Sequence, residues 1–246
     1  MSFRAVRVDG LALAAFCLLM GAAGTAKDSS EQAVDSGSFG VFMNGHRMAT
    51  ETFSVQQSAD GSTIHSEFKS EAGTDKALQT SELQLTSGGE LKKYEWKEIA
   101  PGQSQATVVP SESFLTERFT NNPQEKQHEQ PFLMPASTSM LDDYFFVQRE
   151  VLAWKFLGTA CTREKGELKC PIKPVQFGTL NPHARASMPV SVAFVGREKV
   201  TIRGAERELN RLDLTSDSGA WTLWLDDQYK LQRILIPGEG TEVVRD

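Results

Sequence analysis

The sequence predicts a mainly β protein in which a curved antiparallel sheet encloses one long amphipathic helix. Short runs of alternating apolar and polar residues recur along most of the chain, separated by Gly, Ser, Asn and Asp. This pattern is typical of antiparallel strands joined by turns. Residues 139–157 instead place apolar residues at helical spacing. Because there is no fixed-period repeat and no proline-rich linker, we expect a single β-rich domain over residues 39–246.

The first 26 residues have the order of a secretory signal peptide. Arg4 and Arg7 precede the apolar run Leu11–Ala23, and three small residues then stand before Lys27. An uncleaved membrane anchor is the alternative, but the apolar run is too short to cross about 30 Å of hydrocarbon comfortably. We therefore expect residues 1–26 to be cleaved and the mature protein to be periplasmic or secreted, in the cell envelope of a bacterium.

Composition and charge exclude several classes of partner. The full chain carries a net charge of −6, and the leader contributes +1 through Arg4, Arg7 and Asp9, so the chain from Lys27 onward carries −7. An acidic surface without a basic run argues against binding to nucleic acid, whose phosphates require clustered Lys and Arg. After signal cleavage no segment is long and apolar enough to predict a transmembrane span.

The domain is expected to begin with a hairpin after a loosely held segment. Residues 27–38 are polar and short of large apolar residues, so we expect a flexible lead-in. Asn44-Gly45 then predicts a type I′ turn. Strands flanking this turn would carry apolar residues on both faces, for example Phe39 on one and Phe42 on the other. That arrangement indicates either a sheet partly covered on both sides or a bulge that shifts the register.

Further strands are predicted at hairpin spacing on either side of the helix. In the first half they cover residues 62–70, 78–86, 91–99, 107–109 and 114–119, and in the second half residues 175–179, 189–195, 199–203, 209–214, 221–225, 231–236 and 243–244.

Residues 139–157 are predicted to form the long helix. Ser139 can cap it, and Asp142 and Asp143 would lie in its first turn, where the helix dipole favours negative charge. Its apolar stripe is wider than one-sided packing requires, so we expect the helix to lie in the concave side of the sheet. The stripe comprises Met140, Leu141, Tyr144, Phe145, Val147, Val151, Leu152 and Trp154.

The cysteines predict one disulfide. Cys17 lies inside the apolar run of the leader and follows Phe16, which disfavours lipid attachment, so it is expected to leave with the signal peptide. In an oxidising compartment, the remaining pair Cys161 and Cys170 is expected to form a disulfide. A two-residue turn at Lys165-Gly166 would place the two cysteines opposite each other across a hairpin. A catalytic dithiol would require a closer Cys-x-x-Cys spacing.

No motif predicts catalysis, a metal centre or a cofactor. The four histidines are not in a zinc-binding spacing. His65 and Glu67 would share a strand face, but two ligands do not make a metal site. The adjacent carboxylates Asp142-Asp143 and Asp226-Asp227 are explained by helix capping and by a turn. We therefore expect a non-enzymatic protein without a cofactor.

The order of elements resembles a group of largely uncharacterised exported bacterial proteins. The resemblance is carried by the hairpin Gly40–Phe53, by Met140–Phe145 at the helix start, and by the final segments Trp224–Asp227 and Leu231–Ile234. In these proteins a curved antiparallel sheet folds around a helix, much as in the carriers that bring lipoproteins to the outer membrane. The resemblance implies a half-barrel with an apolar concavity and no catalytic residues.

Two functions from different classes follow. The first is a carrier or binding protein that holds a lipid or a lipoprotein acyl chain in the concavity. The second is a structural or assembly factor of the cell envelope that binds another protein through a sheet edge or rim and has a filled core. The expected partners are therefore a lipid, a lipoprotein or an envelope protein. The candidate lining residues, for each of which plain core packing is the preferred interpretation, are Tyr144, Phe145, Val151, Trp154, Trp221, Leu223 and Trp224.

Overall fold

A computed structural model describes residues 31–71, 76–164 and 167–246, so the predicted signal peptide lies outside the described residues. Fifteen strands form one sheet in the order β8-β7-β6-β5-β4-β3-β2-β1-β17-β16-β15-β14-β13-β12-β9, and β10 and β11 form a separate hairpin. All neighbouring pairs are antiparallel except β9 with β12. The prediction of a mainly antiparallel β fold is confirmed.

The first nine strands precede the helix, and the remaining eight follow it. The bounds before the helix are β1 Gln32–Met43, β2 His46–Ser58, β3 Gly61–Ser70, β4 Leu78–Thr86, β5 Leu91–Ala100, β6 Gln105–Ser111, β7 Phe114–Thr120, β8 His128–Phe132 and β9 Ser139–Met140. After the helix α1 (Val147–Ala160) come β10 Thr162–Glu164, β11 Glu167–Lys169, β12 Val175–Asn181, β13 Ala186–Ile202, β14 Ala205–Ser216, β15 Gly219–Leu225, β16 Leu231–Ile236, the short 3-10 helix η1 Pro237–Glu239, and β17 Thr241–Arg245.

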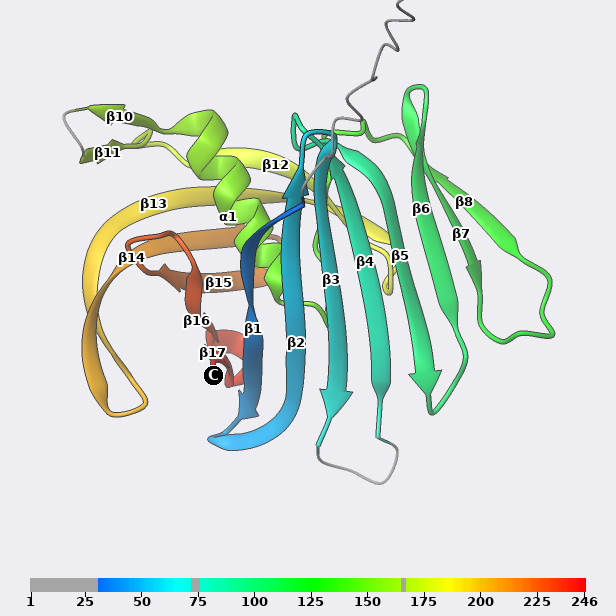
Figure 1. Ribbon diagram of the computed structural model, residues 1–246, viewed down its shortest axis with the longest axis horizontal. Coiled ribbons are helices and arrows are strands. Elements are labelled where there is room, and N and C mark those ends of the chain that lie inside the picture. Colours follow the sequence, from blue (N-terminus) through cyan, green and yellow to red (C-terminus); the bar gives the residue numbers. More distant parts are fainter. Residues whose placement is uncertain (1–30, 72–75, 165–166) are drawn as a thin grey trace, which may run out of the picture.

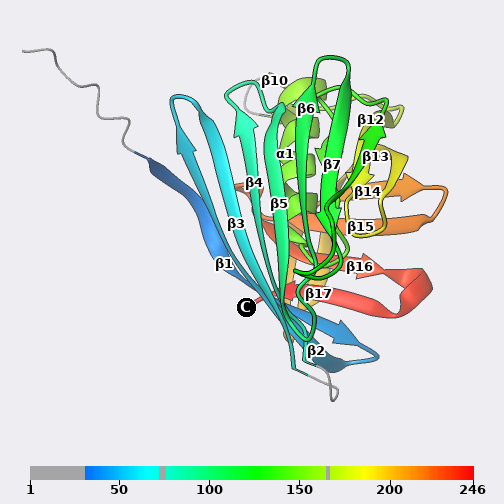
Figure 2. The same cartoon turned by 90° about the vertical axis from the view of Figure 1, so that its right-hand side faces the viewer.

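The large sheet is strongly curved but does not close into a barrel, and α1 lies inside the curve (Figures 1 and 2). One continuous apolar core joins the inner faces of the strands to the helix. Leu152, Ala153 and Phe156 of α1 are fully buried, as are Leu212 and Leu223 of the facing strands. Burial of this kind is the main favourable term in folding, and it fixes the helix against the second half of the sheet.

The opening hairpin has the predicted turn. Asn44 and Gly45 both have positive φ, at 50° and 80°, as a type I′ turn requires. The pairing of β1 with β2 shifts between Val41 and Phe42, which is the bulge alternative of the sequence analysis. The segment that was predicted to be a flexible lead-in is largely a strand, because β1 already begins at Gln32 and its first residues pair with β2.

The helix is shorter and differently placed than predicted. It has 14 residues and begins at Val147, whereas Ser139 lies in β9 and Asp142 lies in the irregular segment between β9 and α1. The predicted cap at Ser139 is therefore wrong. A long amphipathic helix is not observed either, because the polar residues Gln148, Arg149 and Glu150 are buried with their apolar neighbours.

The second half of the sheet contains one very long strand where two were predicted. β13 runs from Ala186 to Ile202 and bends at a register shift between Phe194 and Gly196, with Gly196 at a φ of 128°. The ends of β13 and β14 contribute Val200, Ile202 and Leu209 to a second, smaller apolar cluster with Trp224 and Val244.

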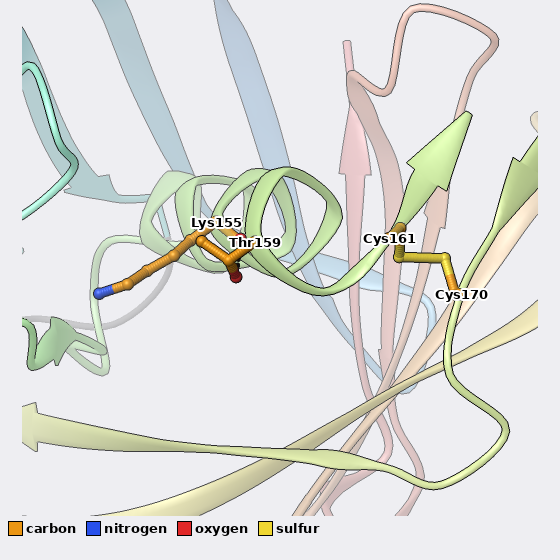
Figure 3. The surroundings of a disulfide bond; sticks show 4 residues. All are labelled: Lys155, Thr159, Cys161 and Cys170. Atoms are coloured by element: carbon orange, nitrogen blue, oxygen red, sulfur yellow. Dashed lines mark hydrogen bonds between the residues drawn. A yellow bond between two sulfur atoms is a disulfide. The ribbon is translucent and has the colours of Figure 1, made fainter.

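The predicted disulfide is confirmed. Cys161 directly follows α1 and bonds to Cys170, with the two Cα atoms 4.2 Å apart (Figure 3). Glu164 pairs with Glu167, as the predicted hairpin requires, although the turn residues Lys165 and Gly166 lie outside the described residues. The bridge ties the end of α1 to the segment that leads into β12.

Candidate functional site

The N-terminus of α1 is held by a carboxylate from a distant strand. Glu51 on β2 accepts a hydrogen bond from the backbone nitrogen of Phe146 at 2.7 Å and a longer one from that of Val147. Ser66 on β3 donates to the same carboxylate at 2.7 Å. Burial raises the pKa of Glu51 to about 7, although these three hydrogen bonds lower it. Glu51 thus supplies the cap that a local side chain does not.

A second buried carboxylate on the helix contacts the opposite part of the sheet. Glu150 accepts a hydrogen bond from the backbone nitrogen of Leu231 at 2.7 Å and lies 3.7 Å from the guanidinium of Arg245. Arg245 and Lys230 also bind Asp35. Burial raises the pKa of Glu150 well above its usual value. Burial alone would also raise the pKa of Asp35, but Arg245 and Lys230 outweigh it, so this pKa is lowered.

The segment before α1 is anchored by a cluster around Asp142. Its carboxylate accepts hydrogen bonds from the hydroxyl of Tyr94 at 2.7 Å and from Nδ1 of His183 at 2.6 Å. Nε2 of His183 lies 2.7 Å from Gln79 Oε1, and its ring stacks on Trp96 at 3.8 Å. Burial, together with Asp142, raises the pKa of Tyr94 well above its usual value. Both ring nitrogens of His183 thus have partners, and the cluster holds the segment before α1 in place.

An open cleft lies between α1 and the strands β2 and β4 of the first half of the sheet. Its volume is about 480 Å³, which is within the range of small-molecule sites, about 300–1,000 Å³. The sheet side comes from β2, β4, the turn after β4, and the segment around β9, and the helix side comes from one face of α1. The lining residues are Gln57, Leu83, Leu85, Ser87, Gly88, Gly89, Thr138, Ser139, Met140, Gln148, Val151, Trp154, Lys155, Gly158 and Thr159.

The cleft changes in polarity from its floor to its rim. Leu83 and Met140 are buried, Val151 and Trp154 are half-buried, and Thr159 at the rim is exposed. Trp154 directs its indole nitrogen away to the backbone oxygen of Tyr229 at 2.7 Å. The apolar floor and polar rim provide an environment for a molecule with an apolar body and a polar end.

Lys155 is the charged residue among those that line the cleft in the described part of the chain. Its ammonium group donates to the backbone oxygen of Ser137 and lies 3.4 Å from Ser139 Oγ. Burial lowers the pKa of Lys155, and the negative charge of Glu90 opposes that effect. Lys155 and Thr159 project from the same side of α1 (Figure 3).

The structure separates the seven candidate lining residues. Val151 and Trp154 line the cleft. Phe145 and Leu223 are fully buried in the main core, and Tyr144 and Trp221 are half-buried against it.

Trp224 was grouped wrongly with Trp221 and Leu223. It belongs to the second cluster, with its indole nitrogen 3.2 Å from a carboxylate oxygen of Glu198. Successive residues of a strand point to opposite faces, so Trp224 cannot share the inner face with Leu223.

Sequence reasoning missed the residues that complete the cleft. Leu83 and Leu85 alternate within the predicted strand 78–86, which is a signal for a common face but not for what that face contacts. Lys155 lies in the predicted helix without any local feature that marks it. Within the described residues, no group of three or more His, Cys, Asp or Glu side chains could hold a metal ion. His65 lies 3.4 Å from Glu82 on the polar side of the sheet.

Comparisons with known proteins bear on the fold. No protein-family model and no curated protein matches this sequence. A solved structure does share the fold. It is the crystal structure of a β-barrel-like protein of a domain of unknown function, DUF1849, from Brucella abortus, with a TM-score of 0.54 and 9% sequence identity. The match covers 86% of this chain and 94% of that chain.

At this identity the likeness shows the fold alone. It supports the β-rich architecture that the sequence resemblance implied, and the likeness to lipoprotein carriers stays a prediction. The described part of the chain contains no helix with the length and apolar character that a membrane span requires.

Proposed function

We propose that the protein is an exported, non-enzymatic carrier or binding protein that holds one hydrophobic molecule, such as a lipid or a lipoprotein acyl chain, in the cleft beside α1. The observation that carries the proposal is the mainly apolar floor of the cleft, whose volume is about 480 Å³. Leu152 and Phe156 of the same helix do not line the cleft and are fully buried in the main core. The compartment is supported by the predicted signal peptide and by the disulfide, which oxidising compartments favour.

Gly158 offers a way to block the cleft without disturbing the core. A Cβ atom added at Gly158 would meet no atom within 4 Å, and the residue lines the cleft on α1. A Gly158→Trp side chain would therefore occupy the mouth of the cleft. The matched control is Ile172→Trp, since Ile172 is fully exposed and does not line the cleft.

The test is saturable binding of the neutral fluorescent probe N-phenylnaphthylamine to the purified mature protein. We expect the wild type and Ile172→Trp to bind it, and Gly158→Trp to bind at least about tenfold more weakly, a difference of about 1.4 kcal/mol. Circular dichroism shows whether each variant is folded. Absence of binding by the folded wild type, or undiminished binding by folded Gly158→Trp, would overturn the proposal.

The second candidate, an assembly factor of the envelope, is favoured by the exposed Leu133. This residue follows the edge strand β8 and is 95% exposed. Pro131 and Glu129 on the same strand disfavour pairing with another strand, which makes this candidate the weaker one. A photo-crosslinking residue at Leu133 in intact envelopes, compared with one at Ile172, tests it: equal crosslinking patterns at both positions would argue against a partner at this edge.

A further inference from the structure

The proposed ligand can be specified further from the charge at the rim of the cleft. Leu83, Met140 and Val151 make the floor mainly apolar, although the buried polar side chains of Thr138 and Gln148 also line the cleft. The rim carries a single ammonium group, that of Lys155, among the described lining residues. The chain as a whole is acidic, so an isolated half-buried cation at an apolar cleft requires an explanation. Arg and Lys elsewhere on the molecule are commonly paired with carboxylates, for example Arg233 with Glu242.

The contacts of Lys155 leave capacity for a ligand. An ammonium group has three donors, and the described contacts are the backbone oxygen of Ser137 and the hydroxyl of Ser139. Glu90 is close enough to attract the charge, but no carboxylate among the described residues lies within 4 Å of it as an ion pair. The two serines thus hold the ammonium group at the rim without neutralising it.

We propose that the cleft selects a single-chain amphiphile with an anionic head, whose tail lies along the apolar floor and whose carboxylate or phosphate binds Lys155. This inference rests on the proposed function. The tail would contact Leu83, Met140 and Val151, and the hydroxyl of Thr159 lies on the same side of α1 as Lys155. A hydrogen bond between charged groups is about twice as strong as one between neutral groups.

The experiment displaces N-phenylnaphthylamine with three molecules of equal chain length: hexadecanoate, hexadecyl phosphate and hexadecanol. We expect the two anions to bind the wild type about tenfold more tightly than the alcohol, as a single charge-assisted contact would provide. The comparison of carboxylate with phosphate distinguishes a free fatty acid from a phosphate-bearing lipid as the source of the head group.

Variants of Lys155 separate charge from shape. Lys155→Met keeps an unbranched side chain of nearly the same length and removes its charge, so it should lose the preference for anions while binding hexadecanol about as tightly as the wild type. Lys155→Arg should retain the preference. The control is Lys93→Met, because Lys93 pairs with Glu95 and does not line the cleft.

The outcomes distinguish this inference from the proposed function. If the alcohol and both anions bind equally, and folded Lys155→Met behaves as the wild type does, the head-group inference is wrong and the carrier function stands. If no ligand displaces the probe and the probe itself does not bind, the carrier function fails first. A loss of anion binding in the Lys93→Met control would show a general charge effect and would also overturn the inference.

Discussion

Glu51 and Phe146 are 95 residues apart in the chain, yet the carboxylate of the first lies 2.7 Å from the backbone nitrogen of the second. This contact joins strand β2 to the start of α1 and thereby positions the helix inside the curved sheet. The helix in turn forms one wall of the cleft.

Glu51→Ala should destabilise the protein strongly. It would leave the backbone nitrogens of Phe146 and Val147 without the partner they have now. A buried donor left without a partner costs about 1–3 kcal/mol. Chemical denaturation measures the loss in free energy of unfolding. Glu67→Ala is the control, since Glu67 is exposed on the neighbouring strand β3, and it should change stability by less than about 0.5 kcal/mol. Equal effects of the two substitutions would contradict the capping role.

Stability should fall as the pH rises from about 4.5 to about 7. Burial raises the pKa of Glu117 to about 7, as it does for Glu51, from an ordinary value of 4.5. The positive charge of Arg185 lowers the pKa of Glu117, and the negative charge of Asp142 raises it. The folded state then holds protons that the unfolded state releases, so the contribution is complete below pH 4.5 and is lost as the pH approaches 7.

The variant Glu117→Gln isolates one part of this dependence. Both carboxylate oxygens of Glu117 are buried without a hydrogen-bond partner among the described residues, so the ionised form is unfavourable at neutral pH. We expect the variant to lose less stability than the wild type between pH 4.5 and pH 8 in urea denaturation. Glu129→Gln, an exposed change on β8, should follow the wild type. An unchanged pH slope in Glu117→Gln would contradict the assignment.

Removing the disulfide should cost a modest amount of stability. Cys161 and Cys170 are separated by 9 positions, and a loop of this length corresponds to about 2–3 kcal/mol in the chain-entropy model. The double variant Cys161→Ser with Cys170→Ser should show this loss in thermal and chemical unfolding. Since neither cysteine lines the cleft, probe binding to the folded variant should persist. Loss of binding in a fully folded variant would show that the bridge shapes the cleft.

Two glycines should respond in opposite directions to the same substitution. Gly158→Ala adds a methyl group that meets nothing within 4 Å in a helix, so it should raise stability by about 0.5–1 kcal/mol. Gly61→Ala would place its Cβ 1.9 Å from the backbone oxygen of Leu85, at a φ of 144°, and should be severely destabilising. Thermal unfolding of the two variants tests this contrast, and similar shifts would contradict it.

Local signals accounted for much of the fold. The turn at Asn44-Gly45 was predictable because that pair favours positive φ at both positions. The bond between Cys161 and Cys170 was predictable because hairpin register places them opposite each other. The start of the helix was not predictable, because it depends on a contact with Glu51 that no pattern near Val147 reveals.

The candidate site was predicted only in part. Val151 and Trp154 lie together along the cleft because helical spacing sets one face of α1; that they contact a ligand stays a prediction. Trp224 was misplaced, since its position in strand register puts it on the face opposite to Leu223.

The amino-acid sequence by itself determined the strand-rich class, the turn at Asn44-Gly45 and the pairing of Cys161 with Cys170, because each depends on residues that are close together in the chain. Only the tertiary structure decided that Leu83 and Leu85 of β4 line the same cleft as Lys155 of α1. The physical reason is that these side chains come from elements about 70 residues apart. Their separation is set by the curvature of the sheet and the buried contacts of α1, which no local periodicity encodes.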